Sequence, residues 1–452
     1  ADDEDLKELQ ALLEDGLKRG SIGIGLALDY MSEGVDAREM RMIFDTAADY
    51  DSLIFVHMRR GINGDPTGLH EVLNLARETG VSLHICHIQH NAMRNIEMFL
   101  EEITNARSEG LDVTSELLPF NAGSAMISSA VFGRNWQEIF DITYEDVEWA
   151  ATGERFTEAT WKERRKNNPE GQVIHHYVKE EWTRQALAAP GVIIVTDLLP
   201  MITRDSKVAP HNAAFTKVLA RYVRETPILD IETAIKKMTL LPAMRLEKVA
   251  PQFKKKGRLQ VGADADITVF DPEMVKDNAT YADPYRTADG ISFVIINGTP
   301  VVREGELVEN TYPGREVLGQ PRHPGQPRFV RTVERQSTGL TGRLERTCST
   351  RTWAGSAFSH TDGSVGNWPM RSSRRPQRTR RQRSSGSTSD QHGSGVNSNS
   401  TFSAYLSSAK SSPRLLAYHS AVRSYQSPCS GVSSSRAWTQ VAPGHSLGSA
   451  MS

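Results

Sequence analysis

The sequence predicts an α/β fold with a parallel β-sheet or barrel at its centre. Two short apolar segments, Leu53–His57 and Val81–His87, each end in a histidine, and a third, Leu111–Pro119, carries a glutamate near its end. Each segment is rich in β-branched or aromatic residues, and a helical pattern follows the first two, which is typical of buried parallel strands. Because the carboxyl ends of parallel strands form the functional face of such folds, polar residues placed there are candidate ligands or catalysts.

Three polar residues occupy these strand ends, namely His57, His87 and Glu116. A single histidine at a strand end is more often a hydrogen-bonded structural residue than a ligand. Two histidines at the ends of successive strands weigh about equally for a metal site and for structural roles, because imidazole is the commonest metal ligand in proteins.

The second strand carries further histidines on both sides of His87. Since side chains alternate along a strand, we expect His87 to share a face with Gln89, and His84 and Cys86 to face the other way. The HxxHxxH spacing is therefore not expected to form a single ligand cluster.

Helical and strand-like patterns alternate through the first part of the chain. Leucines at helical spacing, with acids in the first turn, predict a core-facing helix from Asp2 to Arg19, and Asp36 followed by Glu39 resembles a capping box. The elements expected next are a strand at Ser21–Leu28, a helix ending at Ala48, the strand ending at His57, a helix at Leu69–Glu78, the strand ending at His87, a helix at Arg94–Ser108 and the strand carrying Glu116. Such alternation predicts a parallel sheet or barrel.

The pattern changes twice farther along the chain. Residues 121–189 place four tryptophans among charged residues and are expected to form an insertion with short helices. A buried strand with an aspartate at its end follows at Gly191–Asp197, and helical patterns follow at Ala213–Arg224 and Ile231–Met238. Beyond Gly257 the sequence predicts a small β unit, because Asn-Gly between apolar runs is a strong hairpin signal. Its expected strands are Arg258–Val261, Ile267–Phe270, Ile291–Ile296 and a run at Val301-Val302.

Charge is distributed unevenly along the 452 residues, although the formal net charge is only -2. Beyond Phe329 four acidic residues stand against sixteen basic ones, and the composition is dominated by Ser, Arg, Gly and Thr. Such a segment cannot bury enough apolar surface to offset its ordering entropy, so a disordered tail is expected from about residue 319. The basic block Arg371–Arg383 lacks aromatic interleaving, so no nucleic-acid partner is predicted. A translation artefact such as a frameshift is the preferred explanation of the tail.

The three cysteines, Cys86, Cys348 and Cys429, support neither a disulfide framework nor a paired-cysteine zinc motif. A reducing, cytoplasmic location fits this usage. The sequence shows no apolar run of the roughly 18 residues that a membrane span needs and no signal-peptide pattern. The chain begins at Ala1 without a methionine, and we expect an upstream segment.

Several ordered segments resemble the amidohydrolase superfamily, and most closely its N-acyl-D-amino-acid deacylase (D-aminoacylase) branch. They include GSIGIGLALDY, VHMRR, HICHIQHN, VIIVTD, KMTLLPAMRL and KKGRLQVGADADITVFDP, and the resemblance runs from about Asp5 to Leu318. It implies a TIM-type (β/α)8 barrel whose fifth and sixth strands end in metal-binding histidines, here His57 and His87. It also implies a catalytic Asp197 after the eighth strand, and a small flanking β-sandwich. From the residues alone, Asp197 reads as an ordinary cap or turn residue.

The resemblance implies zinc or another divalent metal, which lowers the pKa of bound water and polarises the scissile carbonyl. Asp197 would then move a proton from water to the leaving nitrogen of a small amide or N-acyl amine substrate. The HxH pair of the first barrel strand and a cysteine ligand have no counterpart before Ser21. We therefore expect an incomplete barrel, with the C-terminal part of the barrel at residues 1–245, the β-sandwich segment at 246–318 and the tail at 319–452.

The positions that bind the substrate's carboxylate in this branch are mostly changed. Gln89 stands where the deacylases have a lysine, Leu118 where they have a tyrosine, and Asn212-Ala213 follows His211 where they have an arginine. Of that set only Ser124 remains. The substrate-binding candidates are Ser124, Gln89, His211 and Arg59, which belongs to the VHMRR segment.

Two functions from different classes remain open. The first is a metal-dependent amidohydrolase acting on an acylated amine or amide. The second is a non-catalytic chain, either a degenerate binding protein or a fragment completed by other sequence. For the printed chain itself we expect weak metal binding at His57 and His87 and no hydrolysis above background, because a catalytic zinc normally needs three protein ligands.

Overall fold

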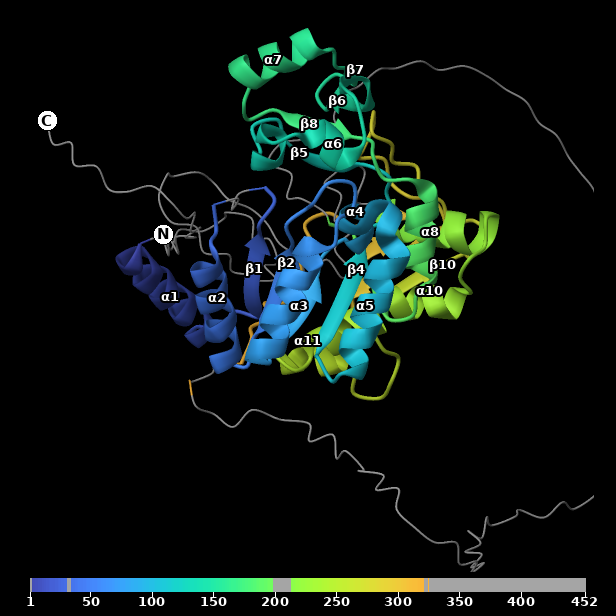
Figure 1. The fold of residues 1–452 in the computed structure, drawn as a ribbon. Helices are drawn as coiled ribbons and strands as arrows, with labels where there is room; N and C mark the ends of the chain where they lie inside the picture. Colours follow the sequence, from blue (N-terminus) through green and yellow to red (C-terminus); the bar gives the residue numbers. More distant parts are fainter. Residues whose placement is uncertain (1, 31–33, 198–212, 321–323, 325–452) are drawn as a thin grey trace, which may run out of the picture. The chain divides into compact units, whose positions relative to one another are not determined.

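The fold is built on a five-stranded parallel sheet, as the computed structural model shows (Figure 1). The structure describes residues 2–30, 34–197, 213–320 and 324. The strands, in the spatial order β1-β2-β3-β4-β9, are β1 (Gly23–Ala27), β2 (Leu53–His57), β3 (Ser82–Ile85), β4 (Val113–Leu117) and β9 (Val192–Ile194). Each neighbouring pair is parallel. The predicted α/β class with a parallel sheet is confirmed.

Both faces of this sheet are covered, which explains why its strands read as continuous apolar runs. Ile54 and Val56 belong to the main core, together with apolar residues of the surrounding helices. Leu53 and Phe55, which alternate with them, belong to a second cluster that includes Leu246. The helices that follow or precede the strands are α1 (Asp3–Lys18), α2 (Ala37–Asp49), α3 (Thr67–Thr79), α4 (Ile88–Ala92), α5 (Ile96–Ser108), α8 (Glu180–Ala188), α9 (Ala214–Lys217), a π-helix (Val218–Glu225), α10 (Ile231–Met238) and α11 (Leu240–Leu246).

Helix caps follow the predicted signals only in part. Asp2 forms a complete capping box with Asp5 at the start of α1. Asp36 accepts a hydrogen bond from the Glu39 backbone N–H at the start of α2, as expected. The side chain of Glu39 is buried instead of completing a capping box, and burial raises its pKa. The apolar face of α2 therefore decides the orientation of Glu39 more strongly than the cap does.

Residues 121–189 contain an antiparallel sheet that the sequence reading missed. Its strands, in the order β5-β8-β6-β7, are β5 (Gly123–Met126), β8 (Gln172–His175), β6 (Val147–Trp149) and β7 (Glu154–Arg155). The expected short helices are present as α6 (Trp136–Phe140) and α7 (Glu158–Asn167). Strands of two to four residues are too short to show a recognisable alternation of apolar and polar residues.

The C-terminal β unit is a four-stranded antiparallel sheet of β10 (Ile267–Phe270), β11 (Ile291–Ile296), β12 (Thr299–Arg303) and β13 (Glu306–Leu307). The hairpin turn at Asn297-Gly298 is present, with φ of 48° and 77°, as a two-residue turn of this type requires. The strand expected at Arg258–Val261 is wrong. Gly257 and Gly262 on either side have φ of +68° and +83°, which bends the chain out of an extended path.

No helix among the described residues is long and apolar enough to cross a membrane. Apart from residues 319, 320 and 324, the segment from 319 to 452 for which disorder was expected lies outside the part of the chain that the structure describes.

A buried arginine fixes the amino ends of two parallel strands. Arg245 on α11 donates to the Asp112 carboxylate at 2.8 Å and to the Leu83 carbonyl at 2.6 Å. Lys248 also contacts Asp112, at 2.6 Å, but its side chain is 66% exposed. Removing Arg245 takes away two hydrogen bonds made by a buried side chain, whereas Lys248 makes one exposed contact to the same carboxylate, so Arg245 matters more to stability than Lys248 does.

We expect Arg245→Met to lower the free energy of unfolding by about 2 kcal/mol at pH 7. Lys248→Met, the matched control, should change it by less than about 1 kcal/mol, because the exposed pair is screened by solvent. Urea unfolding followed by circular dichroism measures both values. Equal losses in the two variants would show that burial of the Arg245 pair is not what stabilises this end of the sheet.

Candidate active site

Two histidine side chains meet at the carboxyl ends of adjacent parallel strands. His57 is the last residue of β2, and His87 lies two residues beyond the end of β3. The Nδ1 atom of His57 and the Nε2 atom of His87 are 2.6 Å apart. Both residues are buried. Burial lowers the pKa of each imidazole, so the pair is neutral near pH 7.

An unusual backbone conformation brings His87 to this position. Its φ is +30°, in the left-handed region that non-glycine residues seldom adopt. The alternation used to place Gln89 on the same face as His87 does not apply here, because β3 ends at Ile85 and Gln89 lies in α4. Asp197, which follows β9, also has a positive φ, of 50°. Strained conformations of this kind cluster at functional sites.

A buried carboxylate lies behind His57. Asp29 follows β1, and its Oδ2 atom is 3.8 Å from the His57 Nε2 atom. Its carboxylate is also close to Arg60 and Arg134, at 3.3 Å and 2.5 Å. Burial alone would raise the pKa of Asp29, but His57 and the two guanidinium groups outweigh burial and hold it well below its usual value. Asp29 is therefore an anion at every physiological pH.

The three histidines of the HxxHxxH segment contact different partners. The Nε2 atom of His84 is 2.8 Å from the Glu116 carboxylate, whereas His87 meets His57. The Nδ1 atom of His90 is 2.8 Å from the Tyr177 hydroxyl. Glu116, a candidate ligand, is thus paired with His84. These three contacts agree with the expectation that the segment is not one cluster.

Asp197 is the acid whose pKa is most changed in the direction that suits a base. Burial, followed by the nearby Glu116 carboxylate, raises the pKa of Asp197 to about 7. Burial is the largest cause of the raised pKa values of Cys86 and Tyr30, and the Asp197 carboxylate raises both further, which places Asp197 among the groups at the carboxyl ends of the strands. Burial and Glu116 keep the Cys86 thiol protonated, so Cys86 is unsuited to nucleophilic chemistry.

The substrate-binding candidates differ in their burial and in their hydrogen-bond partners. Gln89 is fully buried, and its side-chain N–H donates to the Leu118 carbonyl. Among the residues that the structure describes, neither the Gln89 side-chain oxygen nor the buried Ser124 hydroxyl has a hydrogen-bond partner. Arg59 contacts the Glu71 carboxylate of α3 at 3.1 Å and donates to the Val35 carbonyl, so its guanidinium group already has partners within the protein. His211 lies outside the described residues.

The sequence reading missed several residues around the histidine pair, namely Asp29, Arg60, Asn91 and Tyr177. Asp29 follows a predicted strand end in the same way as Asp197 does, and that signal was available. Tyr177 comes from the segment after β8, a strand that the sequence did not reveal. No local pattern predicts that Tyr177 meets Arg60 across 117 residues of sequence.

The donor atoms at the histidine pair suit a divalent cation. Two neutral imidazoles present facing nitrogens, and the field of Glu116 at Asp197 would be offset by a positive ion. Zinc–nitrogen bonds of about 2.0–2.1 Å in a tetrahedral site put two ligand nitrogens about 3.3 Å apart. The two nitrogens would therefore need to move apart by about 0.7 Å, and both would need to turn a lone pair toward the ion, to accept it. Among the described residues no set of three or more His, Cys, Asp or Glu side chains is already arranged around a common centre.

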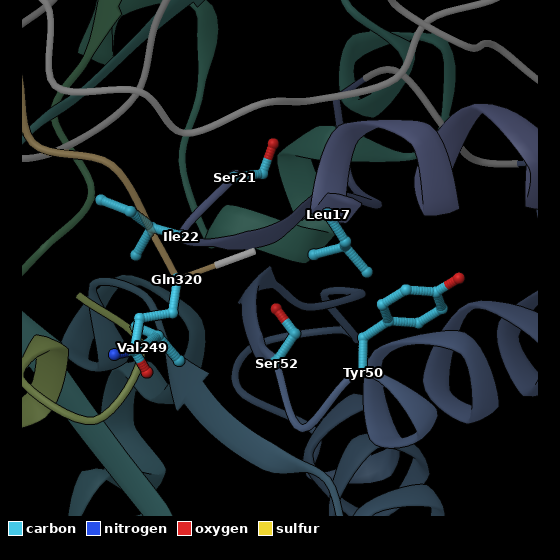
Figure 2. Close-up of a pocket in the computed structure, with 7 residues that line it drawn as sticks. All are labelled: Leu17, Ser21, Ile22, Tyr50, Ser52, Val249 and Gln320. Carbon is cyan, nitrogen blue, oxygen red and sulfur yellow. The ribbon is translucent and has the colours of Figure 1, made fainter. Parts of the chain in front are cut away.

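The hollow drawn in Figure 2 belongs to a different part of the sheet. It is lined by residues that precede the strands and by two residues from later in the chain. These are Leu17, Ser21, Ile22, Tyr50, Ser52, Val249 and Gln320. Ile22 and Ser52 lie just before β1 and β2, whereas His57 ends β2. The hollow is thus at the amino ends of the strands and is not part of the candidate site.

The raised pKa of Asp197 predicts a pH-dependent stability. The folded protein binds the proton of Asp197 more tightly than the unfolded chain, so ionisation between about pH 4 and pH 7 disfavours the fold. Asp197→Asn should raise the free energy of unfolding by about 1–2 kcal/mol at pH 8 and leave it unchanged below pH 4. The value is smaller than the full shift implies because Asp197 is only partly buried. Urea titrations at both pH values test this, and a pH-independent difference would contradict it.

No protein-family model matches the chain. Among curated proteins, the N-acyl-D-glutamate deacylase of Alcaligenes xylosoxydans xylosoxydans is 30% identical over 342 residues, which are 72% of this chain and 66% of the relative. The D-aminoacylase of the same organism is 30% identical over 327 residues, which are 67% of this chain and 63% of the relative. The chain thus spans slightly less than two thirds of the length of these relatives.

Solved structures show the same relationship. A D-aminoacylase described as defining a novel subset of amidohydrolases has a TM-score of 0.61 and 24% identity, covering 70% of this chain and 67% of its own. The N-acyl-D-glutamate deacylase of Bordetella bronchiseptica, solved with zinc and a phosphonate inhibitor, has a TM-score of 0.58 and 25% identity, covering 68% and 66%. The resemblance seen in the sequence is confirmed: the chain is a homologue of the N-acyl-D-amino-acid deacylases.

Proposed function

We propose that this site is that of a metal-dependent amidohydrolase, which cleaves the C–N bond of a small N-acyl amine or amide with an activated water. The observation that carries the proposal is the nitrogen-to-nitrogen contact of His57 and His87 at neighbouring strand ends. The relatives support it, because they are named an N-acyl-D-glutamate deacylase and a D-aminoacylase. A solved D-aminoacylase of similar fold was studied for its binuclear metal centre.

Each residue of the site has a distinct role in this proposal. His57 and His87 hold zinc or another divalent metal through their facing nitrogens. The bound metal supplies Lewis acidity toward the substrate carbonyl and toward water. Asp197, with a pKa of about 7, accepts a proton and returns it to the leaving nitrogen, because a base is most effective when its pKa lies near the working pH.

The substrate proposed for this site presents a neutral hydrogen-bonding group where the relatives bind a carboxylate. Gln89 and Leu118 contact each other, and the free lone pairs of the Gln89 oxygen point to a donor on the substrate. Ser124 adds a second neutral group. An anion placed there would be desolvated without a cationic partner, which is costly.

We propose the same reducing, cytoplasmic location that the cysteine usage favours.

For the 452-residue chain by itself we propose weak metal binding and no hydrolysis above background. Within the described residues the facing donors are two imidazoles, and Asp197 is less available as a base if it becomes the third ligand. The alternative is a non-catalytic binding protein. In that alternative the 2.6 Å contact between His57 and His87 is a hydrogen bond that needs no metal.

Metal titration separates these possibilities. Calorimetry with Co²⁺ or Zn²⁺ should show about one equivalent bound to the wild-type chain and none to His87→Ala. His70→Ala, whose histidine is half exposed and contacts Glu102, is the matched control and should bind as the wild type does. Equal binding by all three proteins would overturn the metal site. Tight binding together with amide turnover that His87→Ala abolishes would support the amidohydrolase and contradict the inactivity of the chain.

The proposed specificity predicts the effect of a charge at residue 89. Gln89→Lys should tighten binding of N-acetyl-D-glutamate to the zinc-loaded chain by about tenfold, because a charge-assisted pair replaces a neutral contact. Gln89→Met, which fills a similar volume without charge, should not. Calorimetric dissociation constants for this acid and its neutral amide give the comparison. An unchanged ratio in Gln89→Lys would remove residue 89 from the substrate site.

A further inference from the structure

Arg60 is a fully buried guanidinium beside the histidine pair that the proposed mechanism does not use. Its side chain is 0% exposed. The Nε atom is 3.3 Å from the Asp29 carboxylate, Nη1 donates to the Tyr177 hydroxyl at 2.9 Å, and Nη2 donates to the Asn91 side-chain oxygen at 3.4 Å. The Arg60 backbone N–H also donates to Asp29, at 3.0 Å. One side chain thus connects three elements that are distant in sequence.

Two of these contacts reach the outer partners of the two histidines. Asp29 lies 3.8 Å from the His57 Nε2 atom, and the Asn91 side-chain nitrogen lies 3.3 Å from the His87 Nδ1 atom. The inner nitrogens of the rings face each other. Arg60 therefore holds both groups that contact the outer edges of the pair.

The Arg60 guanidinium group also packs against two aromatic rings of the insertion, residues 121–189. The guanidinium carbon is 4.9 Å from the centre of the Phe140 ring and 5.4 Å from that of Tyr177. Burial raises the pKa of Tyr177 to about 12, so its hydroxyl is neutral and accepts the hydrogen bond from Arg60. The ring contacts and hydrogen bonds leave the guanidinium a single orientation, because stacked and hydrogen-bonded arginines lose their rotational freedom.

We propose that Arg60 is a positioning residue that sets the orientation of both imidazoles through Asp29 and Asn91. The expected effect of Arg60 on metal binding rests on the proposed function. Groups behind metal-binding histidines fix the ring orientation and tautomer, and losing them typically weakens metal affinity 10- to 100-fold. Lysine cannot replace Arg60, because a single ammonium cannot reach three partners in the fixed directions of a planar fork.

The first test uses the metal-free full-length chain. With ¹⁵N-labelled histidine, nuclear magnetic resonance should show a protected ring N–H signal from the His57–His87 contact, assigned by its loss in His57→Ala. We expect this signal to disappear in Arg60→Met and in Arg60→Lys, and to weaken in Tyr177→Phe. It should persist in Arg245→Met, which removes another buried arginine of the same sheet. Tyr177→Phe also keeps the proposal testable if the Arg60 variants do not fold.

The second test uses Co²⁺ alone as the probe, followed by its visible absorption. Arg60→Met should bind about 10- to 100-fold more weakly than the wild type, and Arg245→Met within about twofold of it. A wild-type chain that binds no Co²⁺ would overturn the metal proposal, while the ring N–H signal would still decide the role of Arg60. Wild-type signals and affinity in Arg60→Met, or equal losses in Arg245→Met, would show that Arg60 does not position the pair.

Discussion

The contact between the buried imidazoles of His57 and His87 depends on a balance of charge around it. Asp29 is a buried anion that two guanidinium groups neutralise, and burying such a carboxylate without them would be very costly. The same anion faces the outer nitrogen of His57. Strand ends, insertion and histidine pair therefore form one connected polar network in an apolar interior, where a polar group left without its partner is costly.

The sheet supplies the geometry that makes the network possible. Parallel strands β1, β2, β3 and β9 end at one edge, so that Asp29, His57, His87 and Asp197 lie at or just beyond successive strand ends. The positive φ angles of His87 and Asp197 depart from the extended conformation at two of these ends. Because protein cores are closely packed, the surrounding apolar residues hold the backbone in these conformations despite their energetic cost.

Much of the fold was predictable because its helices are long enough to show a period and its central strands read as continuous apolar runs. The limits of α10 match the predicted helix Ile231–Met238, and the apolar runs ending at His57 and His87 contain β2 and β3. The sheet of the insertion was not predictable, since its strands have too few residues to show alternation. The same holds for the candidate site. Residues at strand ends could be predicted from the sequence, whereas the roles of Arg60 and Tyr177 depend on a contact between distant parts of the chain, which no local pattern predicts.

The central claim is that the facing nitrogens of His57 and His87 bind a divalent metal. X-ray absorption at the zinc edge of the zinc-loaded chain tests it most directly. Two imidazole nitrogens at about 2.0 Å are expected, with loss of imidazole scattering in a variant that lacks both histidines. A coordination shell of oxygen atoms alone, or a spectrum unchanged by removing His57 and His87, would contradict the account.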